Sequence, residues 1–111
     1  MRIDRLRLGD IQTSISKIRE KTVVGEDVFY KDEMLQVWVV HHLRIIGEAL
    51  ASLSPELRDA NASWARPIIA TRSILVHHYF VVKLEVIWDI VENHLDDVEA
   101  RVKGLLESLP E

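Results

Sequence analysis

Residues 32–53, with the sequence DEMLQVWVVHHLRIIGEALASL, decide the fold class of this chain. When they are wound at about 100° per residue, most of their apolar side chains fall within one arc of about 120°, the pattern of an α-helix with a single buried face. His42 lies in the middle of this arc, so we expect a core histidine that makes a hydrogen bond. The arc comprises Leu35, Trp38, Val39, His42, Ile45, Ile46, Ala49 and Leu53.

A smaller apolar strip lies elsewhere on the same predicted helix. It consists of Val37, Val40, Gly47 and Ala51. A helix with two apolar faces can be covered on both of them, so the second strip is a candidate contact surface for a partner chain.

The remaining segments have helical periodicity as well, and none alternates apolar with polar residues for long. The stretch 22–31, which contains Gly25, reads as a connection. Pro67 is expected in the first turn of its helix, because proline has no N–H to donate further along. The predicted helices cover about 7–21, with Leu8, Ile11, Ile15 and Ile18 inward, then 32–53, 54–60, 63 or 66 to 80, 83–94 and 96–109.

This pattern predicts an all-α fold, a small antiparallel bundle of about five to six helices. The length of 111 residues predicts a single domain over 1–111. A net charge of −4 argues against broad electrostatic binding of nucleic acid, so any phosphate chemistry must be local. With no cysteine, no secretory signal and no apolar run of membrane-spanning length, we expect a cytoplasmic protein without membrane contact.

The most informative motif is RSILVHHY at 72–79, an Arg, four residues, a His, one residue and a Tyr within an otherwise apolar helix. On an ideal helix Arg72 and Tyr79 are about 20° apart, whereas Arg72 and His77 are about 140° apart and ~7.5 Å apart along the axis. Three arrangements can bring Arg72 and His77 together: a wrapped Arg side chain, a distorted helix, or a two-fold dimer that joins two copies of the motif.

The chemistry that such residues suit is phosphodiester cleavage in RNA. A neutral His can take the proton from a ribose 2′-hydroxyl, and an Arg can stabilise the charge that develops on the phosphate. This scheme needs no metal and no cofactor. On spacing alone, a surface Arg and a core or capping His are the commoner interpretation. The neighbouring pairs His41-His42 and His77-His78 do not predict a metal site, because adjacent side chains point about 100° apart.

Several segments resemble the HepT family, the toxin half of HepT–MNT toxin–antitoxin pairs within the HEPN superfamily. They are Arg7-Leu-Gly-Asp10-Ile11, Leu43-Arg-Ile-Ile-Gly47-Glu48-Ala49, Trp64, Arg72…His77-His78-Tyr79-Phe80, and Leu84-Glu-Val-Ile-Trp88-Asp-Ile-Val. The resemblance covers essentially the whole chain.

The resemblance implies an all-α HEPN bundle that forms a homodimer with the motif at the interface. It implies metal-independent endoribonuclease activity on RNA, with Arg72 and His77 as the catalytic pair. It also implies a minimal nucleotidyltransferase (MNT) antitoxin as partner, which transfers AMP from ATP to Tyr79 and so neutralises the toxin.

Three further residues are assigned supporting roles. Glu48 is expected to orient Arg72 or His77, and His78 is expected to be a peripheral phosphate contact or simply exposed. Ser73 occupies the position where family members usually carry Asn, and it has a shorter reach and fewer donors. This departure leaves open an alternative, a catalytically inactive helical protein that binds nucleotide or a nucleotidyltransferase.

Overall fold

The computed structural model describes the backbone of residues 2–77 and 83–110 and the side chains of residues 3–71 and 83–110. All regular elements within these ranges are α-helices, so the predicted all-α fold is confirmed. None of the described helices combines the length and the apolar character that crossing a membrane requires. The helices are α1 (Arg2–Thr22), α2 (Glu26–Lys31), α3 (Glu33–Ala51), α4 (Pro55–Ala60), α5 (Ala62–His77), α6 (Leu84–Asn93) and α7 (Leu95–Ser108).

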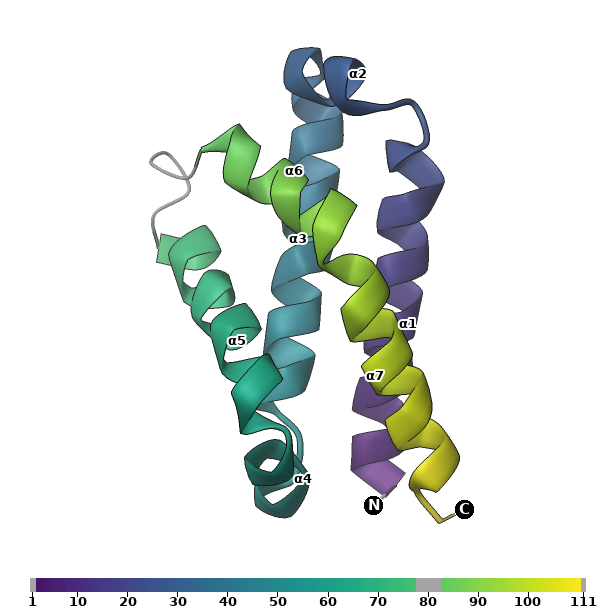
Figure 1. The fold of residues 1–111 in the computed structure, drawn as a ribbon. Helices are drawn as coiled ribbons and strands as arrows, with labels where there is room; N and C mark the ends of the chain where they lie inside the picture. The colour runs from purple at the N-terminus through teal and green to yellow at the C-terminus, as the bar shows by residue number, and fades with distance from the viewer. Residues whose placement is uncertain (1, 78–82, 111) are drawn as a thin grey trace.

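Helix α3 is the central element of the bundle. It packs antiparallel to α1 on one side and to α5 on the other, while α6 and α7 cross the face between α5 and α1 (Figure 1). The N-terminal end of α1 and the C-terminal end of α7 lie at the same end of the bundle (Figure 1). Both long neighbours of α3 therefore bury parts of it, and α5 is positioned directly by the central helix.

The core forms where the stripe of α1 meets α3. The predicted inward residues of α1 are all fully buried, which confirms that stripe: Leu8, Ile11, Ile15 and Ile18. On α3 the prediction is partly wrong, because Trp38 and Ile45 are only half-buried, whereas Val40 and Gly47 of the second strip are buried within the chain. Packing on two sides widens the buried arc of α3 and moves its centre.

The stretch 22–31 is predicted to be a connection, but it also contains the short helix α2. Gly25 reverses the chain with a φ of 96°, a conformation that glycine adopts without strain. Phe29 of α2 is fully buried, with its ring centroid 5.2 Å from that of Trp88 on α6. Helix α2 is thus a cap on the core. Together with the separate short helices it gives seven described helices rather than five to six.

Two helix starts also differ from the prediction. Helix α1 begins at Arg2 rather than near Arg7. Helix α5 begins at Ala62, so Pro67 is its sixth residue and lies beyond the first turn. The proline cannot donate to the Ser63 carbonyl one turn earlier, a loss that the second turn of the helix tolerates here.

Candidate functional site

The motif lies on the C-terminal part of α5. The backbone of Arg72, Ser73 and His77 is α-helical and continuous with the rest of Ala62–His77, while their side chains are outside the described residues. His78 and Tyr79 lie wholly outside them. Because the helix is regular through His77, positions 72 and 77 remain about 140° apart around its axis. A distorted helix is therefore not the way in which these two residues come together.

Position 72 is seven residues, or two turns, beyond Ala65. Ala65 is 1% exposed in the bundle, and seven residues of ideal helix bring position 72 to within about 20° of it around the axis. Position 77 lies on a different side of the same helix. The fold thus places the two motif positions on separate sides of an element that packs directly on α3.

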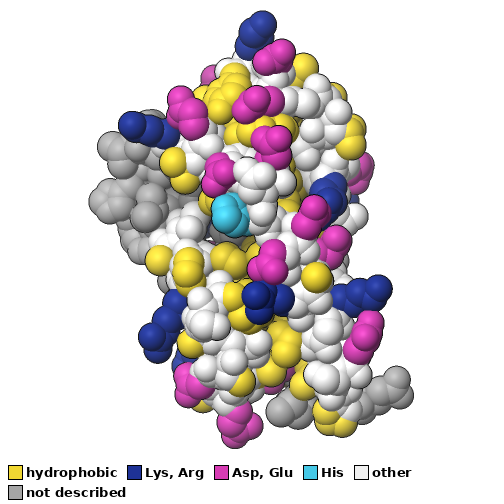
Figure 2. All heavy atoms as spheres, viewed as in Figure 1, with side chains coloured by type: hydrophobic (Ala, Val, Ile, Leu, Met, Phe, Trp, Pro, Cys, Tyr) yellow, Lys and Arg dark blue, Asp and Glu magenta, His cyan; other side chains and the backbone are white. Residues whose placement is uncertain are grey.

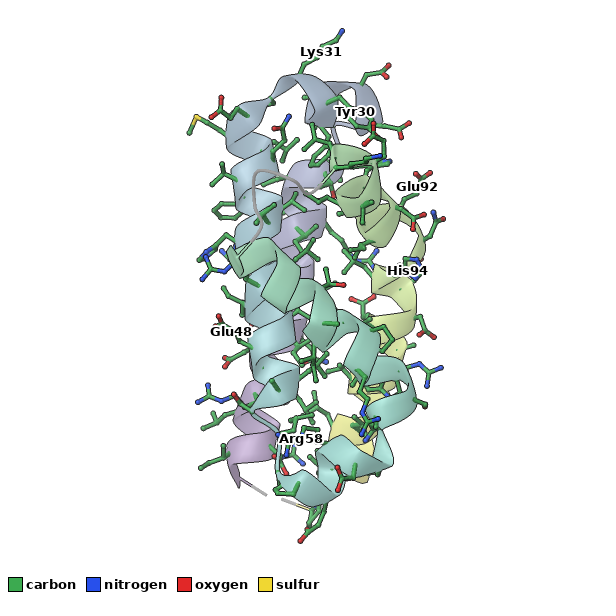
Figure 3. All side chains as sticks on the ribbon, turned by 90° about the vertical axis from the view of Figure 1, so that its left-hand side faces the viewer. Tyr30, Lys31, Glu48, Arg58, Glu92 and His94 are labelled. Atoms are coloured by element: carbon green, nitrogen blue, oxygen red, sulfur yellow. The ribbon has the colours of Figure 1, made fainter. Side chains whose placement is uncertain are left out.

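Glu48, the predicted supporting carboxylate, projects from α3 toward solvent (Figure 3). Its carboxylate is 4.0 Å from the Arg44 guanidinium one turn earlier. It also lines a hollow of about 250 Å³ together with Arg7 and Asp10 of α1, which form an ion pair of 3.1 Å. Its described surroundings are therefore the groove between α1 and α3, and its action on Arg72 or His77 remains a proposal.

His42 is the core histidine that the sequence predicts. It is 8% exposed, and its Nδ1 lies 3.2 Å from the hydroxyl oxygen of Ser14 on α1. Burial is the main influence that lowers the pKa of His42 below its ordinary 6.5, with smaller contributions from His41 and Lys17. His42 therefore has a structural role between α1 and α3. Within the described side chains, no group of three His, Asp or Glu residues is arranged to hold a metal ion.

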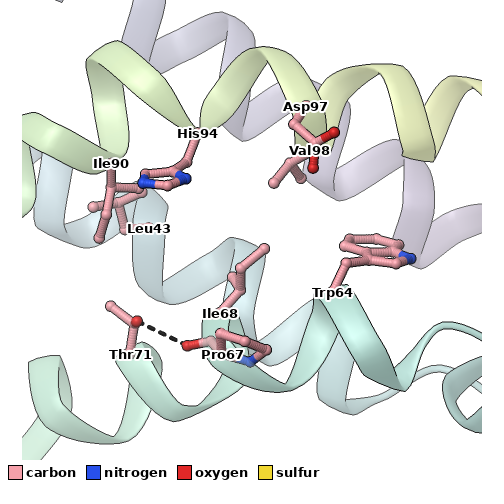
Figure 4. Close-up of a pocket in the computed structure, with 9 residues that line it drawn as sticks. All are labelled: Leu43, Trp64, Pro67, Ile68, Thr71, Ile90, His94, Asp97 and Val98. Atoms are coloured by element: carbon pink, nitrogen blue, oxygen red, sulfur yellow. Dashed lines mark hydrogen bonds between the residues drawn. The ribbon is translucent and has the colours of Figure 1, made fainter.

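A second hollow, of about 380 Å³, lies directly beside the start of the motif (Figure 4). Its floor comes from Leu43 of α3, one wall from α5 and the opposite wall from the α6–α7 junction. Thr71, the residue before Arg72, is part of its lining. The complete lining is Leu43, Trp64, Pro67, Ile68, Thr71, Ile90, His94, Asp97 and Val98. We call it the α5–α7 pocket.

Trp64 is held in a fixed orientation at one end of this pocket. Its indole Nε1 donates to Asn61 Oδ1 at 2.9 Å, and the Arg101 guanidinium lies 5.6 Å from the ring centroid. Trp64 is half-buried and packs against the hydrophobic core at the edge of the pocket. The helical spacing of Trp64, Ile68 and Thr71 is the signal by which a shared face could have been found.

The ionisable residues of the pocket, His94 and Asp97, come from the α6–α7 junction and the first turn of α7, and acidic side chains are frequent on the upper part of the face in Figure 2. Asp89 accepts from Asn93 Nδ2 at 2.7 Å and lies 3.2 Å from His94 Nε2. The Asn93 hydrogen bond is the main influence that lowers the pKa of Asp89 below 3.8. Burial is the second influence and acts in the opposite direction, and His94 lowers the pKa further. His94 and Asp97 both line the pocket, a placement that the sequence pattern does not reveal.

The class of protein is defined by an all-α bundle with an Arg-x₄-His motif on α5. Comparison with known families identifies this class. The family model "Ribonuclease HepT-like" matches residues 11–105, which run from α1 into α7. The chain belongs to this HepT-like family, as its sequence resemblance indicates.

Several relatives carry provisional names of the same kind. A Caldanaerobacter subterraneus protein provisionally named as an RNase is 35% identical over 91 residues, 80% of each chain. A Thermococcus cleftensis protein provisionally named ribonuclease HepT is 30% identical over 102 residues, 88% of this chain and 91% of that one. A Methanocaldococcus jannaschii protein named both as a gamma-glutamylcyclotransferase and, provisionally, as an RNase is 32% identical over 108 residues, 95% of this chain but 48% of its own length. No solved structure matches the chain.

Proposed function

We propose that this protein is a ribonuclease, and more specifically a metal-independent endoribonuclease. The observation that carries the proposal is the family match over residues 11–105, which includes the helix bearing Arg72 and His77. The names of the relatives support the same class of activity. Toxicity to the cell in which it is made follows if the RNA that it cleaves is essential.

In the proposed reaction, His77 removes the proton from a ribose 2′-hydroxyl. The 2′-oxygen attacks the adjacent phosphorus, the bond from phosphorus to the 5′-oxygen breaks, and the leaving oxygen takes up a proton. The products are a 2′,3′-cyclic phosphate and a 5′-hydroxyl. Arg72 binds the phosphate and stabilises the charge that develops on its oxygens. Ser73, Glu48 and His78 support these two residues by hydrogen bonding or by phosphate contact.

A homodimer completes the site in this proposal, because a regular helix separates positions 72 and 77 by about 140°. Exposed apolar side chains on the N-terminal part of α3 support association with a second copy. Met34 is 83% exposed and Val37 is 51% exposed, and both line hollows on that surface. A two-fold axis would bring an Arg72 from one copy near a His77 from the other.

The proposed partner is a minimal nucleotidyltransferase antitoxin that transfers AMP from ATP to the hydroxyl of Tyr79. The tyrosine oxygen attacks the α-phosphorus of ATP, and pyrophosphate leaves. On an ideal helix a residue seven positions beyond Arg72 lies two turns away on nearly the same side, so the added phosphate would compete for the guanidinium that RNA needs. Modification would therefore both fill and neutralise the site.

The test is cleavage of RNA by the purified protein in the presence of a chelator. We expect 5′-hydroxyl and 2′,3′-cyclic phosphate ends. Arg72→Ala and His77→Ala should each abolish cleavage, while Arg66→Ala, at an exposed position of the same helix, should not. Sedimentation should show the same dimer in all variants. Cleavage that persists in both motif variants would contradict the assignment.

Ser73 favours one alternative, a catalytically inactive helical protein that binds nucleotide or a nucleotidyltransferase. Replacement of the usual Asn shortens the side chain beside the catalytic pair. Under this alternative, expression of the chain without any partner leaves growth unchanged, whereas the ribonuclease proposal predicts arrest that His77→Ala relieves.

A further inference from the structure

We propose that the α5–α7 pocket binds the base of an RNA nucleotide that flanks the cleaved phosphate, and that it prefers bases with an exocyclic amino group. This inference rests on the proposed ribonuclease function. It adds a base-selecting subsite whose residues lie on α3, α5, α6 and α7, outside the Arg-x₄-His motif.

The size and walls of the pocket suit a flat, largely apolar group. Its volume of about 380 Å³ lies in the range of small-molecule sites, which are mostly apolar with a few polar groups. Leu43 and Ile68 lie deep between the helices, while Ile90 and Val98 line the opposite wall (Figure 4). A base is uncharged, so it brings no charge of its own into this space.

Trp64 offers a stacking surface that needs no reorganisation. Its ring is fixed by the 2.9 Å hydrogen bond to Asn61 and is flanked by Arg101, so little conformational freedom is lost on binding. Bases stack on aromatic side chains with little dependence on sequence. Stacking on Trp64 therefore supplies affinity, and another group must supply selectivity.

The polar groups at the pocket are mainly hydrogen-bond acceptors. Asp97 accepts from Arg101 Nε through Oδ2 at 2.8 Å, which leaves the lone pairs of Oδ1 for a ligand. Thr71 donates its hydroxyl proton to the Pro67 carbonyl at 2.9 Å, so its oxygen can only accept from a ligand. Acceptors require a ligand with N–H donors. Guanine, adenine and cytosine present amino groups, whereas uracil has a single ring N–H between two carbonyls.

The position of the pocket agrees with a flanking nucleotide rather than with the cleaved one. Thr71 precedes Arg72 on α5, and position 77 is about 9 Å further along the axis. The carboxylates of Asp89 and Asp97 at the α6–α7 side disfavour a phosphate there. The base would thus enter the pocket while the RNA backbone stays on the α5 side, near Arg72.

The first test is a titration of the full chain with guanosine, adenosine, cytidine and uridine, followed by nuclear magnetic resonance of backbone amides and the Trp64 indole N–H. Nucleosides carry no phosphate, so the test is independent of cleavage and is repeated in His77→Ala. We expect guanosine, adenosine and cytidine to shift the signals of Trp64, Ile68 and Val98, with uridine weaker by about fivefold.

Asp97→Asn is the decisive variant, because it is an exposed position and should not affect folding. We expect it to weaken guanosine binding by about fivefold and to reduce the preference over uridine. Asp96→Asn is the matched control, since Asp96 is the neighbouring residue of α7 but pairs with Arg19 and does not line the pocket. Trp64→Leu should weaken all nucleosides alike, and Trp64→Phe should restore part of that binding.

Equal binding of all four nucleosides, equal effects of Asp97→Asn and Asp96→Asn, or unshifted pocket signals would each overturn the proposal. Unshifted signals with nucleosides, but shifts on addition of a nucleotidyltransferase partner, would assign the pocket to protein docking instead. In cleavage assays, Asp97→Asn should change the base preference beside the cut sites. Absence of cleavage by the unmodified protein would overturn the ribonuclease function alone, because the nucleoside titration still decides the pocket.

Discussion

The hydroxyl of Ser14 on α1 lies 3.2 Å from Nδ1 of His42 on α3, and both residues are buried in the layer between the two helices. The other ring nitrogen of His42, Nε2, has no hydrogen-bond partner among the described residues. A second proton on the ring would therefore be buried without an acceptor, and the neutral form is the one that the fold accommodates.

This arrangement predicts a pH-dependent stability. Because burial lowers the folded-state pKa of His42 below 6.5, the unfolded chain binds more protons than the folded one once the pH falls below about 6.5. The free energy of unfolding should thus fall as the pH decreases through that range and level off below the folded-state pKa. Urea denaturation between pH 7.5 and 5 measures it. His42→Gln should flatten the dependence, and the exposed His41→Gln should not. An unchanged slope in His42→Gln would exclude this histidine as its source.

Asp4 predicts a second, more acidic transition. It is 2% exposed and accepts two hydrogen bonds from Ser54, from the backbone N–H at 2.7 Å and from the hydroxyl at 2.6 Å. Burial alone raises the pKa of Asp4, but the hydrogen bonds from Ser54 outweigh it and bring the pKa below 3.8. The stabilisation is thus present above pH 3.8 and is lost as the pH falls through the folded-state pKa. At pH 7, Asp4→Ala should cost about 1–3 kcal/mol in urea denaturation. Asp10→Ala, at an exposed carboxylate of α1, is the control and should cost far less.

Phe29 should be essential for the cap that α2 forms on the core. Its ring is fully buried against Trp88, so Phe29→Ala leaves a cavity and should lower the free energy of unfolding by about 3–5 kcal/mol. Val28→Ala, at the neighbouring position that is 42% exposed, should stay within about 0.5 kcal/mol of the unmodified chain. Chemical denaturation of the two variants decides the matter, and equal losses would show that α2 is not docked through Phe29.

Ser73 offers a test of how the motif is completed. If the longer Asn of the family adds one hydrogen bond to the catalytic pair, Ser73→Asn should raise the cleavage rate by up to about tenfold, equivalent to roughly 1.4 kcal/mol. Ser63→Asn, at an exposed position of the same helix, should have no effect. A rate that Ser73→Asn leaves unchanged or lowers would mean that serine already fulfils this role.

Tyr79 offers a test of regulation that separates modification from catalysis. Tyr79→Phe should keep most of the cleavage activity, since the phenol takes no part in the proposed proton transfer. It should, however, escape neutralisation by a nucleotidyltransferase partner with ATP. After incubation of the chain without substitutions with the partner and ATP, mass spectrometry should show added AMP on Tyr79. Tyr30, which should stay unmodified, is the internal control. Neutralisation of Tyr79→Phe without modification would indicate inhibition by binding alone.

Strong and long periodicities allowed correct prediction from sequence, whereas short elements did not. The stripe from Leu8 to Ile18 spans several turns and was predicted correctly, as was the core position of His42. Helix α2 was missed because six residues contain too few repeats to reveal a buried face. The burial of Phe29 depends on its contact with Trp88, which is distant in the sequence. Pro67 was placed too early because local rules prefer proline in a first turn, and they do not include the tertiary packing that carries α5 past it.

The candidate site divides in the same way. The motif residues and the family were identified from sequence, because their identities and spacing are local. The α5–α7 pocket was not, since Thr71 and Asp97 are far apart in the chain and line one pocket only in the folded bundle. By itself, then, the sequence determined helical structure, a buried histidine and the position of the Arg-x₄-His motif on one helix. Only the tertiary structure decided which helix faces meet and where they leave a pocket, because those depend on contacts between residues that are distant along the chain.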